Sequence, residues 1–229
     1  DYEPIWKAVL RVQGADGRPL PNGLTAIPSE RIPRTELRRI SLPIYGVDRF
    51  RNMFTARQLL ALSELARSIA GNDAGAASVN RLLSLCVGKT ADLNNANTPW
   101  KPDAECPVHT LARHDIPMAW DFAEACPLGE ASGSFFSAYE RTAASIGPSH
   151  VGTTRGASVQ SSDACHHPLP DQSVAVWFTD PPYYDAVPYA HLSDFFYVWE
   201  RRALSDVAVD GASSLSPKDN ECVVDRPHS

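Results

Sequence analysis

The sequence predicts an α/β fold that carries a mostly helical insertion. Residues 173–179, SVAVWFT, form a continuous apolar, β-branched and aromatic run, which is typical of a central strand buried on both faces of a parallel sheet. Apolar residues recur at helical spacing in three segments before this run and in one segment after it. We therefore expect a strand- and turn-rich segment at 1–50, a helical insertion at 51–150 and a region at 151–229 that carries the strand.

The first two predicted regions have local signals of their own. Proline and short apolar clusters are frequent in the first 50 residues, and proline removes main-chain donors, so short strands and turns are expected there. Thr55 is the predicted N-cap of a helix that Gly71 ends. Two further helices are expected at about 76–87 and 134–146, with a long polar loop at 89–130 between them.

The predicted strand leads into a turn and a fourth helix. It ends at Asp180-Pro181-Pro182-Tyr183, because two proline rings prevent further ladder pairing. Pro188 suits the first position of a helix that runs to about residue 203. The buried stripe of this helix is expected to contain four large side chains, which are Leu192, Phe195, Phe196 and Trp199.

Composition excludes several classes of protein. The 229 residues are 43% hydrophobic and 21% charged, as in a globular protein, and no apolar run approaches the roughly 20 residues of a membrane span. The five cysteines form no Cys-x-x-Cys pair, which suits a reducing cytoplasm. A net charge of −6 argues against a protein that coats nucleic acid by charge alone. Without a Ser-His-Asp order, a Walker loop or a kinase loop, hydrolase and phosphotransfer functions lack support.

The strongest functional pattern is the turn at residues 180–183. In open α/β sheets ligands bind at the carboxyl ends of strands, so Asp180 and Tyr183 are expected at the edge that forms the site. The rigid proline pair can aim the Asp180 carboxylate and the Pro181 carbonyl at one point. Two such acceptors suit the exocyclic amine of a nucleobase, because they direct its lone pair at an electrophile and stabilise the positive charge that develops. Tyr183 offers a face on which a flipped base can stack.

These four residues resemble the catalytic motif of amino-methyltransferases that use S-adenosylmethionine. The longer string DPPYYDAVPYAHLSDFFYVWERR is similar to that of large adenine-specific DNA methylases whose N-terminal part is a domain of unknown function. The resemblance extends from about Ile27 to Cys222 and includes IPSERIP, FTARQLLAL, IPMAWDFAEACP and SDACHHPLPDQSVAVWFTDPPY. It implies a partial Rossmann-like methyltransferase fold in which residues 151–229 are the catalytic region.

On the acceptor side, the resemblance implies a role for each residue of the motif. Asp180 and the Pro181 carbonyl would bind the target amino group, Pro182 would fix the turn, and Tyr183 would stack on the base. The implied acceptor is adenine in DNA, flipped out of the duplex because its amine is otherwise engaged in pairing. Within the same enzyme class, the alternatives are cytosine, an RNA base or a protein side-chain amide.

On the donor side, Asp163 matches the acidic position that contacts the adenine moiety of S-adenosylmethionine in this family. Tyr184 and Asp185 would help to shape the pocket. Two positions depart from the family's pattern, because His191 stands where an acidic or amide residue is expected and Glu200 where an apolar one is expected. The reaction that the resemblance implies requires no metal.

The sequence lacks the glycine-rich loop that holds the methyl donor. Methyltransferases of this type carry a Gly-x-Gly loop after the first strand, and none of the 13 glycines here belongs to one. We therefore expect an internal fragment of a longer protein, which keeps the amine-binding half of the site. The alternative from another class is a non-catalytic fragment or a DNA- or protein-binding module without the cofactor loop.

The other candidate sites have weaker patterns. Two cysteines and two histidines, of which the first pair is spaced Cys-x-x-His, could in principle bind zinc. Their overall spacing is unusual for a zinc site, so no metal site is expected at Cys106, His109, His114 and Cys126. The run at 165–167, Cys-His-His, is expected to be solvated. The basic cluster RIPRTELRR at 31–39 could contact phosphate, although a solvated surface is its commoner role.

Overall fold

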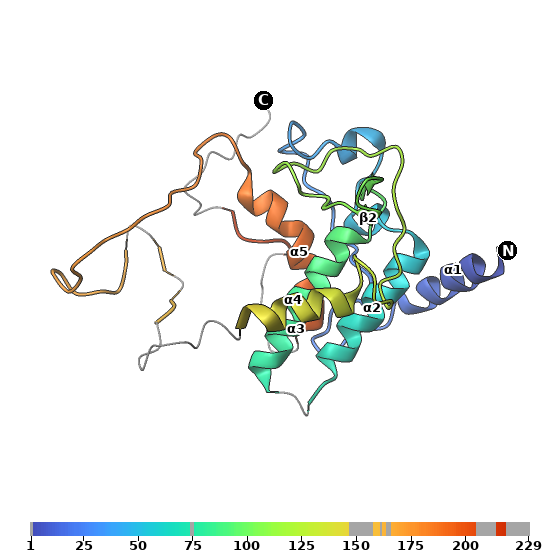
Figure 1. Ribbon diagram of the computed structural model, residues 1–229, viewed down its shortest axis with the longest axis horizontal. Helices are drawn as coiled ribbons and strands as arrows, with labels where there is room; N and C mark the ends of the chain where they lie inside the picture. The colour runs from blue at the N-terminus through green and yellow to red at the C-terminus, as the bar shows by residue number, and fades with distance from the viewer. Residues whose placement is uncertain are drawn as a thin grey trace.

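The computed structural model describes residues 2–73, 76–146, 158–160, 162–163, 166–204 and 214–218. This part of the chain is mostly helical and contains a single two-stranded sheet (Figure 1). The α-helices are α1 (Glu3–Ala15), α2 (Ala56–Ala70), α3 (Ala77–Leu93), α4 (Phe135–Ile146) and α5 (Tyr189–Ala203). Short 3-10 helices form at Leu42–Tyr45 and Phe50–Met53, and β1 (Trp100–Lys101) pairs antiparallel with β2 (Cys106–Pro107). Within the described residues, no helix combines the length and apolar content that a membrane crossing needs.

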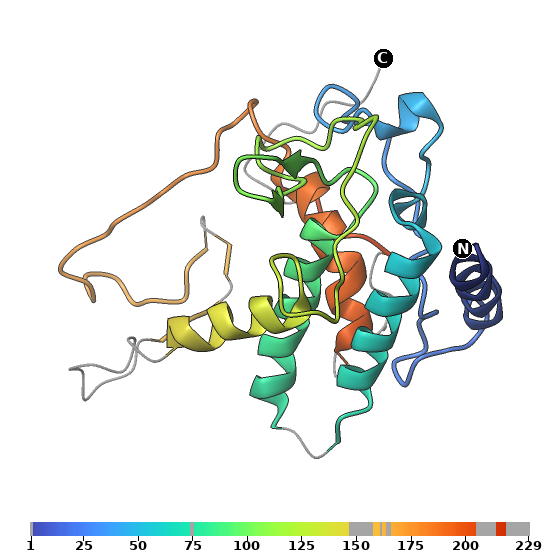
Figure 2. The same cartoon turned by 45° about the vertical axis from the view of Figure 1, so that its right-hand side comes forward.

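The core forms where α5 packs against both α2 and α3 (Figure 2). Phe195 and Trp199 of α5 are fully buried there, which confirms their predicted place in its apolar stripe; Leu192 is also buried and Phe196 is partly buried. The Phe54 ring, which precedes α2, meets the Trp199 ring edge-on with their centroids 5.3 Å apart. Aromatic side chains of this size contribute much of the apolar area of a core, so α5 is the central element of the helical body.

The helices α2 and α4 lie where the apolar spacing predicts them, whereas α3 is longer than predicted. Thr55 caps α2, because its hydroxyl accepts from the Gln58 amide at 3.3 Å while the Gln58 side chain accepts from the Thr55 amide at 2.9 Å. The helix α3 continues to Leu93 instead of ending near Val87. The extension carries the buried Asp92, whose carboxylate accepts a hydrogen bond from the Thr110 amide of the loop that follows, and this bond makes the extension favourable.

Two regions that were expected to contain strands differ in the structure. Residues 3–15 form α1, whose Ala8 and Val12 are buried on the side that packs against α2. Pro4 does not prevent this helix because it lies in the first turn, where its missing amide would have no partner. Residues 173–179 are not a strand, since the main chain of 174–179 makes no hydrogen bond to any described residue. The described residues contain no other part of the predicted Rossmann-like sheet, which stays a prediction.

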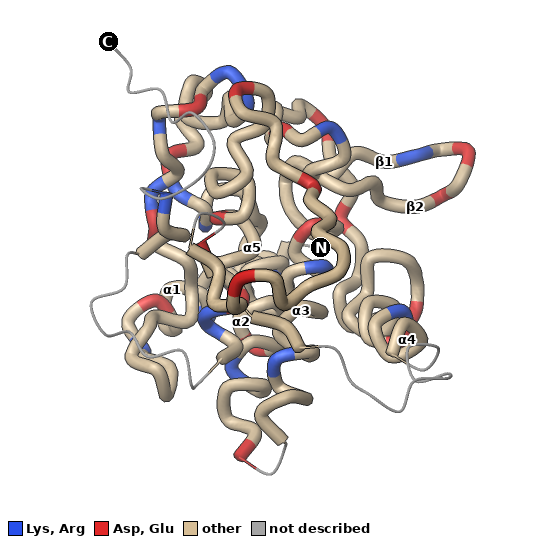
Figure 3. The backbone as a smooth tube through the Cα atoms, turned by 90° about the vertical axis from the view of Figure 1, so that its left-hand side faces the viewer, with Lys and Arg blue, Asp and Glu red and all other residues tan. Residues whose placement is uncertain are grey.

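Acidic and basic residues are interspersed along the backbone of the body (Figure 3). Among the described residues, two ion pairs involve a fully buried residue of α5. Arg202, near the end of α5, is 1% exposed and lies 2.9 Å from the Glu30 carboxylate. Burial lowers the pKa of Arg202, and the adjacent Glu30 opposes that change. Asp194 is also fully buried and lies 2.9 Å from the ammonium of Lys218. These pairs attach the loop before residue 31 and the segment 214–218 to α5.

Candidate functional site

The motif at residues 180–183 lies in a segment that projects from the helical body and leads back to α5 (Figure 1). Every described residue from 158 to 186 is exposed. The side chains expected to contact the base are open to solvent, with Tyr183 68% exposed and Tyr184 70% exposed. The structure thus presents the motif at the surface, and the described residues do not enclose it.

Three contacts fix the end of this segment to the body. Val187, just before α5, is buried. The Tyr183 amide donates a hydrogen bond to the Tyr189 hydroxyl at 3.3 Å, which joins the motif to the first turn of α5. Arg38 donates to the main-chain carbonyl of Asp185 at 3.2 Å, and its guanidinium lies 3.7 Å from the Asp185 carboxylate. The motif is therefore held at its C-terminal end while its own side chains stay accessible.

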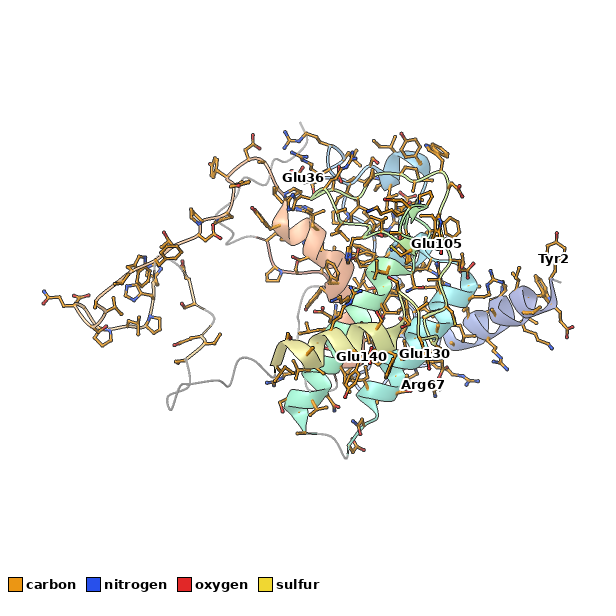
Figure 4. The ribbon with its side chains drawn as sticks, in the orientation of Figure 1. Tyr2, Glu36, Arg67, Glu105, Glu130 and Glu140 are labelled. Carbon is orange, nitrogen blue, oxygen red and sulfur yellow. The ribbon has the colours of Figure 1, made fainter. Side chains whose placement is uncertain are left out.

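The loop at 35–38 forms a platform beside the motif. Thr35 Oγ1 lies 2.8 Å from Nε2 of His191 in the first turn of α5, a contact between residues 156 positions apart. Glu36 is 7% exposed and lines a small depression together with Asp185. Figure 4 shows Glu36 close to the N-terminal end of α5. The platform thus brings a carboxylate and an arginine from the N-terminal part of the chain next to the predicted site.

Sequence reasoning missed most of this platform. Thr35 and Glu36 carry no motif of their own, and Arg38 is visible only as part of the basic cluster RIPRTELRR. The structure also gives a role to His191, one of the two positions that differ from the methylases that the sequence resembles, because this side chain is buried and bonded to Thr35. The other departure, Glu200, is partly buried in the contact between α3 and α5, and burial raises its pKa.

Asp163 lies in a short described stretch outside the helical body. Its Oδ2 is 3.0 Å from Nδ1 of His166, and the next ring, that of His167, has its centroid 5.0 Å from the Trp177 ring. The Trp177 contact places this turn alongside the run that leads into the motif. Cys165, the first residue of the run that was expected to be solvated, lies outside the described residues.

The described residues do not fit a closed site for S-adenosylmethionine. The Asp163 side chain is 59% exposed, and its described neighbours in the segment are exposed as well. A cofactor of this size is normally held in a cleft with convergent main-chain donors, and the sequence has no Gly-x-Gly loop to supply them. This part of the chain offers hydrogen-bond acceptors for an amine and one carboxylate for the methyl donor. It does not enclose the methyl donor.

The four residues around the Cys-x-x-His start are not arranged as metal ligands. In the described parts of the chain, no three His, Cys, Asp or Glu side chains are placed to share a metal ion. His109 instead lies with its Nδ1 2.5 Å from the carboxylate of Asp92, which is buried at the end of α3. His109 therefore belongs to a local polar contact.

That contact is part of a buried polar cluster in the region predicted only as a polar loop. The Thr110 amide donates to Asp92 at 2.9 Å, and the Asn95 side chain donates to the Thr110 hydroxyl at 2.7 Å. The Asn97 amide donates in turn to the Asn95 side chain at 2.8 Å. The cluster holds the loop after α3 against the helix, so its role is structural. The only signal in the sequence is the string NNANT, whose short polar side chains favour turns and caps.

Comparisons with known proteins give no match, because no protein-family model, no curated protein and no solved structure matches the chain. The function is therefore argued from the residues of the motif and from the contacts that hold them.

Proposed function

We propose that the chain carries the amine-binding half of a DNA methyltransferase that modifies the exocyclic amine of adenine. The observation that carries this proposal is the motif at residues 180–183, fixed to the helical body through Tyr189 and Arg38. An Asp-Pro-Pro turn has little backbone freedom, so it keeps a carboxylate and a carbonyl in a constant relation. A weakly nucleophilic amine gains most from acceptors that are positioned in advance.

The proposed chemistry uses two acceptors and one ring of this chain. The Asp180 carboxylate and the Pro181 carbonyl accept the two N–H bonds of the amine and direct its lone pair outward. The same oxygens stabilise the positive charge that develops on the nitrogen, and Asp180 is suited to receive the proton that the product releases. The exposed Tyr183 ring stacks on the flipped adenine. S-adenosylmethionine, when bound, supplies an electrophilic methyl group on sulfur.

The proposal places the methyl donor against Asp163 and requires further residues to enclose it, because the described residues leave that carboxylate exposed. The exposure of the motif favours one alternative of another class, a non-catalytic DNA- or protein-binding module. Cytosine, an RNA base and a protein amide remain alternative acceptors, since the same pair of oxygens can hold any of these amines.

The test is methyl transfer to DNA by the 229-residue chain. A duplex with one unpaired adenine lowers the cost of flipping the base, and mass spectrometry detects N6-methyladenine. The expected result is methylation that Asp180→Ala abolishes. Asp171→Ala is the matched control, because Asp171 is an exposed aspartate of the same segment outside the motif.

Calorimetry with S-adenosylmethionine separates the alternatives. Binding that Asp163→Ala weakens supports the proposed donor site. Methylation that survives Asp180→Ala would overturn the proposed role of the motif. A chain that neither binds the donor nor methylates DNA would be the non-catalytic module.

A further inference from the structure

A concentrated arginine surface lies next to the candidate site. Residues 31–51 contain six arginines and two acidic residues, although the whole chain has a net charge of −6. We define the arginine surface by four of them, Arg31, Arg34, Arg38 and Arg49. Three of these guanidinium groups have described contacts, and their geometry shows how the surface is built.

Arg31 and Arg49 are partners across an antiparallel main-chain bridge. Main-chain hydrogen bonds of 2.9 and 3.1 Å flank this bridge and fix its register. Bridge partners start from the same face of a ladder, and here the neighbouring Ile32 and Phe50 are buried. Two like charges directly opposite each other are unfavourable, and an anion bound between them would remove that cost.

The positive charge of this pair is not neutralised within the described residues. Arg49 donates to the main-chain carbonyl of Ser29, which carries no charge. Arg31 is exposed and makes no side-chain hydrogen bond or ion pair in the described part of the chain. Arg34, by contrast, is paired with Asp48 at 2.7 Å. Because Asp48 balances its charge, Arg34 contributes hydrogen-bond donors to the surface and little net positive charge.

Arg38 connects this surface to the motif. It donates to the Asp185 carbonyl, and Asp185 lies two residues beyond Tyr183. Of the four arginines, Arg38 is therefore the one that contacts the segment carrying the exposed tyrosines. Guanidinium groups bind phosphate oxygens in bidentate fashion, which suits a regularly charged backbone.

We propose that the arginine surface binds the phosphate backbone of duplex DNA and orients the motif toward the base that is modified. This inference rests on the proposed function, because it assigns a DNA-positioning surface to the same site. A protein partner fits less well, since the defining side chains are all cationic and stable protein interfaces have a largely apolar centre that is depleted of charge.

The experiment measures binding of a fluorescent DNA duplex by anisotropy, with salt titrated from 50 to 200 mM, a range over which phosphate contacts change affinity strongly. Each phosphate contact contributes about 0.9 to the slope of log K against log salt. We expect the slope to fall by about 0.9 in Arg31→Ala and by about 1.8 in Arg31→Ala/Arg49→Ala. Arg31→Ala alone keeps the test decisive if the double variant folds poorly, because Arg31 is exposed and has no side-chain hydrogen bond or ion pair to lose among the described residues.

Arg67→Ala is the matched control. Arg67 is an exposed arginine of α2 that pairs with Glu64, and Figure 4 shows it far from Glu36. Its slope should equal that of the unaltered chain. Duplex binding with an unchanged slope in both arginine-surface variants overturns this inference and leaves the proposed function standing. Absence of duplex binding by the unaltered chain overturns both this inference and DNA as the partner. Binding of a fluorescent acidic peptide, lost in Arg31→Ala, in place of duplex binding would assign the surface to a protein.

Discussion

The helical body and the projecting segment at 158–186 use their apolar side chains in opposite ways. Trp199 in the body is completely buried, whereas Phe178 in the segment is 92% exposed and Val176 is 79% exposed. Helices satisfy their main-chain groups internally, so α2, α3 and α5 need only side-chain packing to form a core. A strand needs neighbours on its edges, and the described residues offer none to 174–179. The candidate chemistry lies at the junction of the two regions.

A matched pair of aromatic truncations should give the greatest difference between the two regions. Trp199→Ala removes a buried ring of the core and should cost about 3–5 kcal/mol of the free energy of unfolding. Phe178→Ala should change it by less than about 0.5 kcal/mol, because that ring is already in water. Urea unfolding followed by circular dichroism measures both. Similar losses in the two variants would remove the contrast between body and segment.

The next largest loss of stability is expected from a substitution in the buried polar cluster after α3. Asn95→Ala removes donors to Thr110 and to two main-chain carbonyls, and it leaves the Asn97 amide without the side-chain oxygen to which it donates. We expect a loss of about 1–3 kcal/mol in the same unfolding measurement. Asn52→Ala, at an exposed asparagine, is the control and should be close to neutral. A neutral Asn95→Ala would mean that the loop is not held by this cluster.

Elements that depend on neighbouring residues can be predicted from the sequence, whereas contacts between residues far apart in the sequence cannot. The helices α2, α4 and α5 follow from local spacing and caps such as Thr55. The prediction for residues 3–15 is wrong because frequent proline favours turns, whereas Pro4 lies in the first turn of α1 and is compatible with the helix. The motif is visible from its own residues. The platform at 35–38 is not, because its partners are more than 140 positions away in sequence.

A smaller effect concerns Glu200, a charged residue inside the body. A Cβ atom at Gly88 would lie 2.9 Å from Glu200 Oε1, so the glycine of α3 makes room for this carboxylate. Burial raises the pKa of Glu200 in the folded state above that of the unfolded chain. The folded state therefore binds this proton more tightly, and stability falls as pH rises from the ordinary glutamate pKa of about 4.3 through the raised value.

Glu200→Gln removes the charge with little change of shape. We expect it to stabilise the body by about 1 kcal/mol or less at pH 7 and to have almost no effect near pH 4, where the carboxyl group is protonated. Thermal unfolding across this pH range measures the difference. Glu64→Gln, at an exposed glutamate of α2, is the control. A variant that is destabilised more at pH 7 than at pH 4 would contradict the expected direction of the pH dependence.

The smallest effect sharpens the boundary between body and segment. Tyr189→Phe removes the hydroxyl that accepts from the Tyr183 amide and should cost no more than about 1 kcal/mol of global stability. Its specific effect should be faster hydrogen exchange at the Tyr183 amide, with the α5 amides unchanged. Unchanged exchange at Tyr183 would show that this hydrogen bond does not anchor the motif.

A packed helical body presents an exposed segment that carries the motif, and hydrogen exchange of the unaltered chain, resolved by residue, is the sharpest test of this arrangement. We predict that the amides at 174–180 exchange nearly as fast as those of an unstructured peptide, because none of them donates to a described residue. The amides at 195–202 in α5 should be protected to the level of global unfolding. Equal protection in the two stretches would contradict this arrangement, because it would mean that residues 174–180 are paired in a sheet.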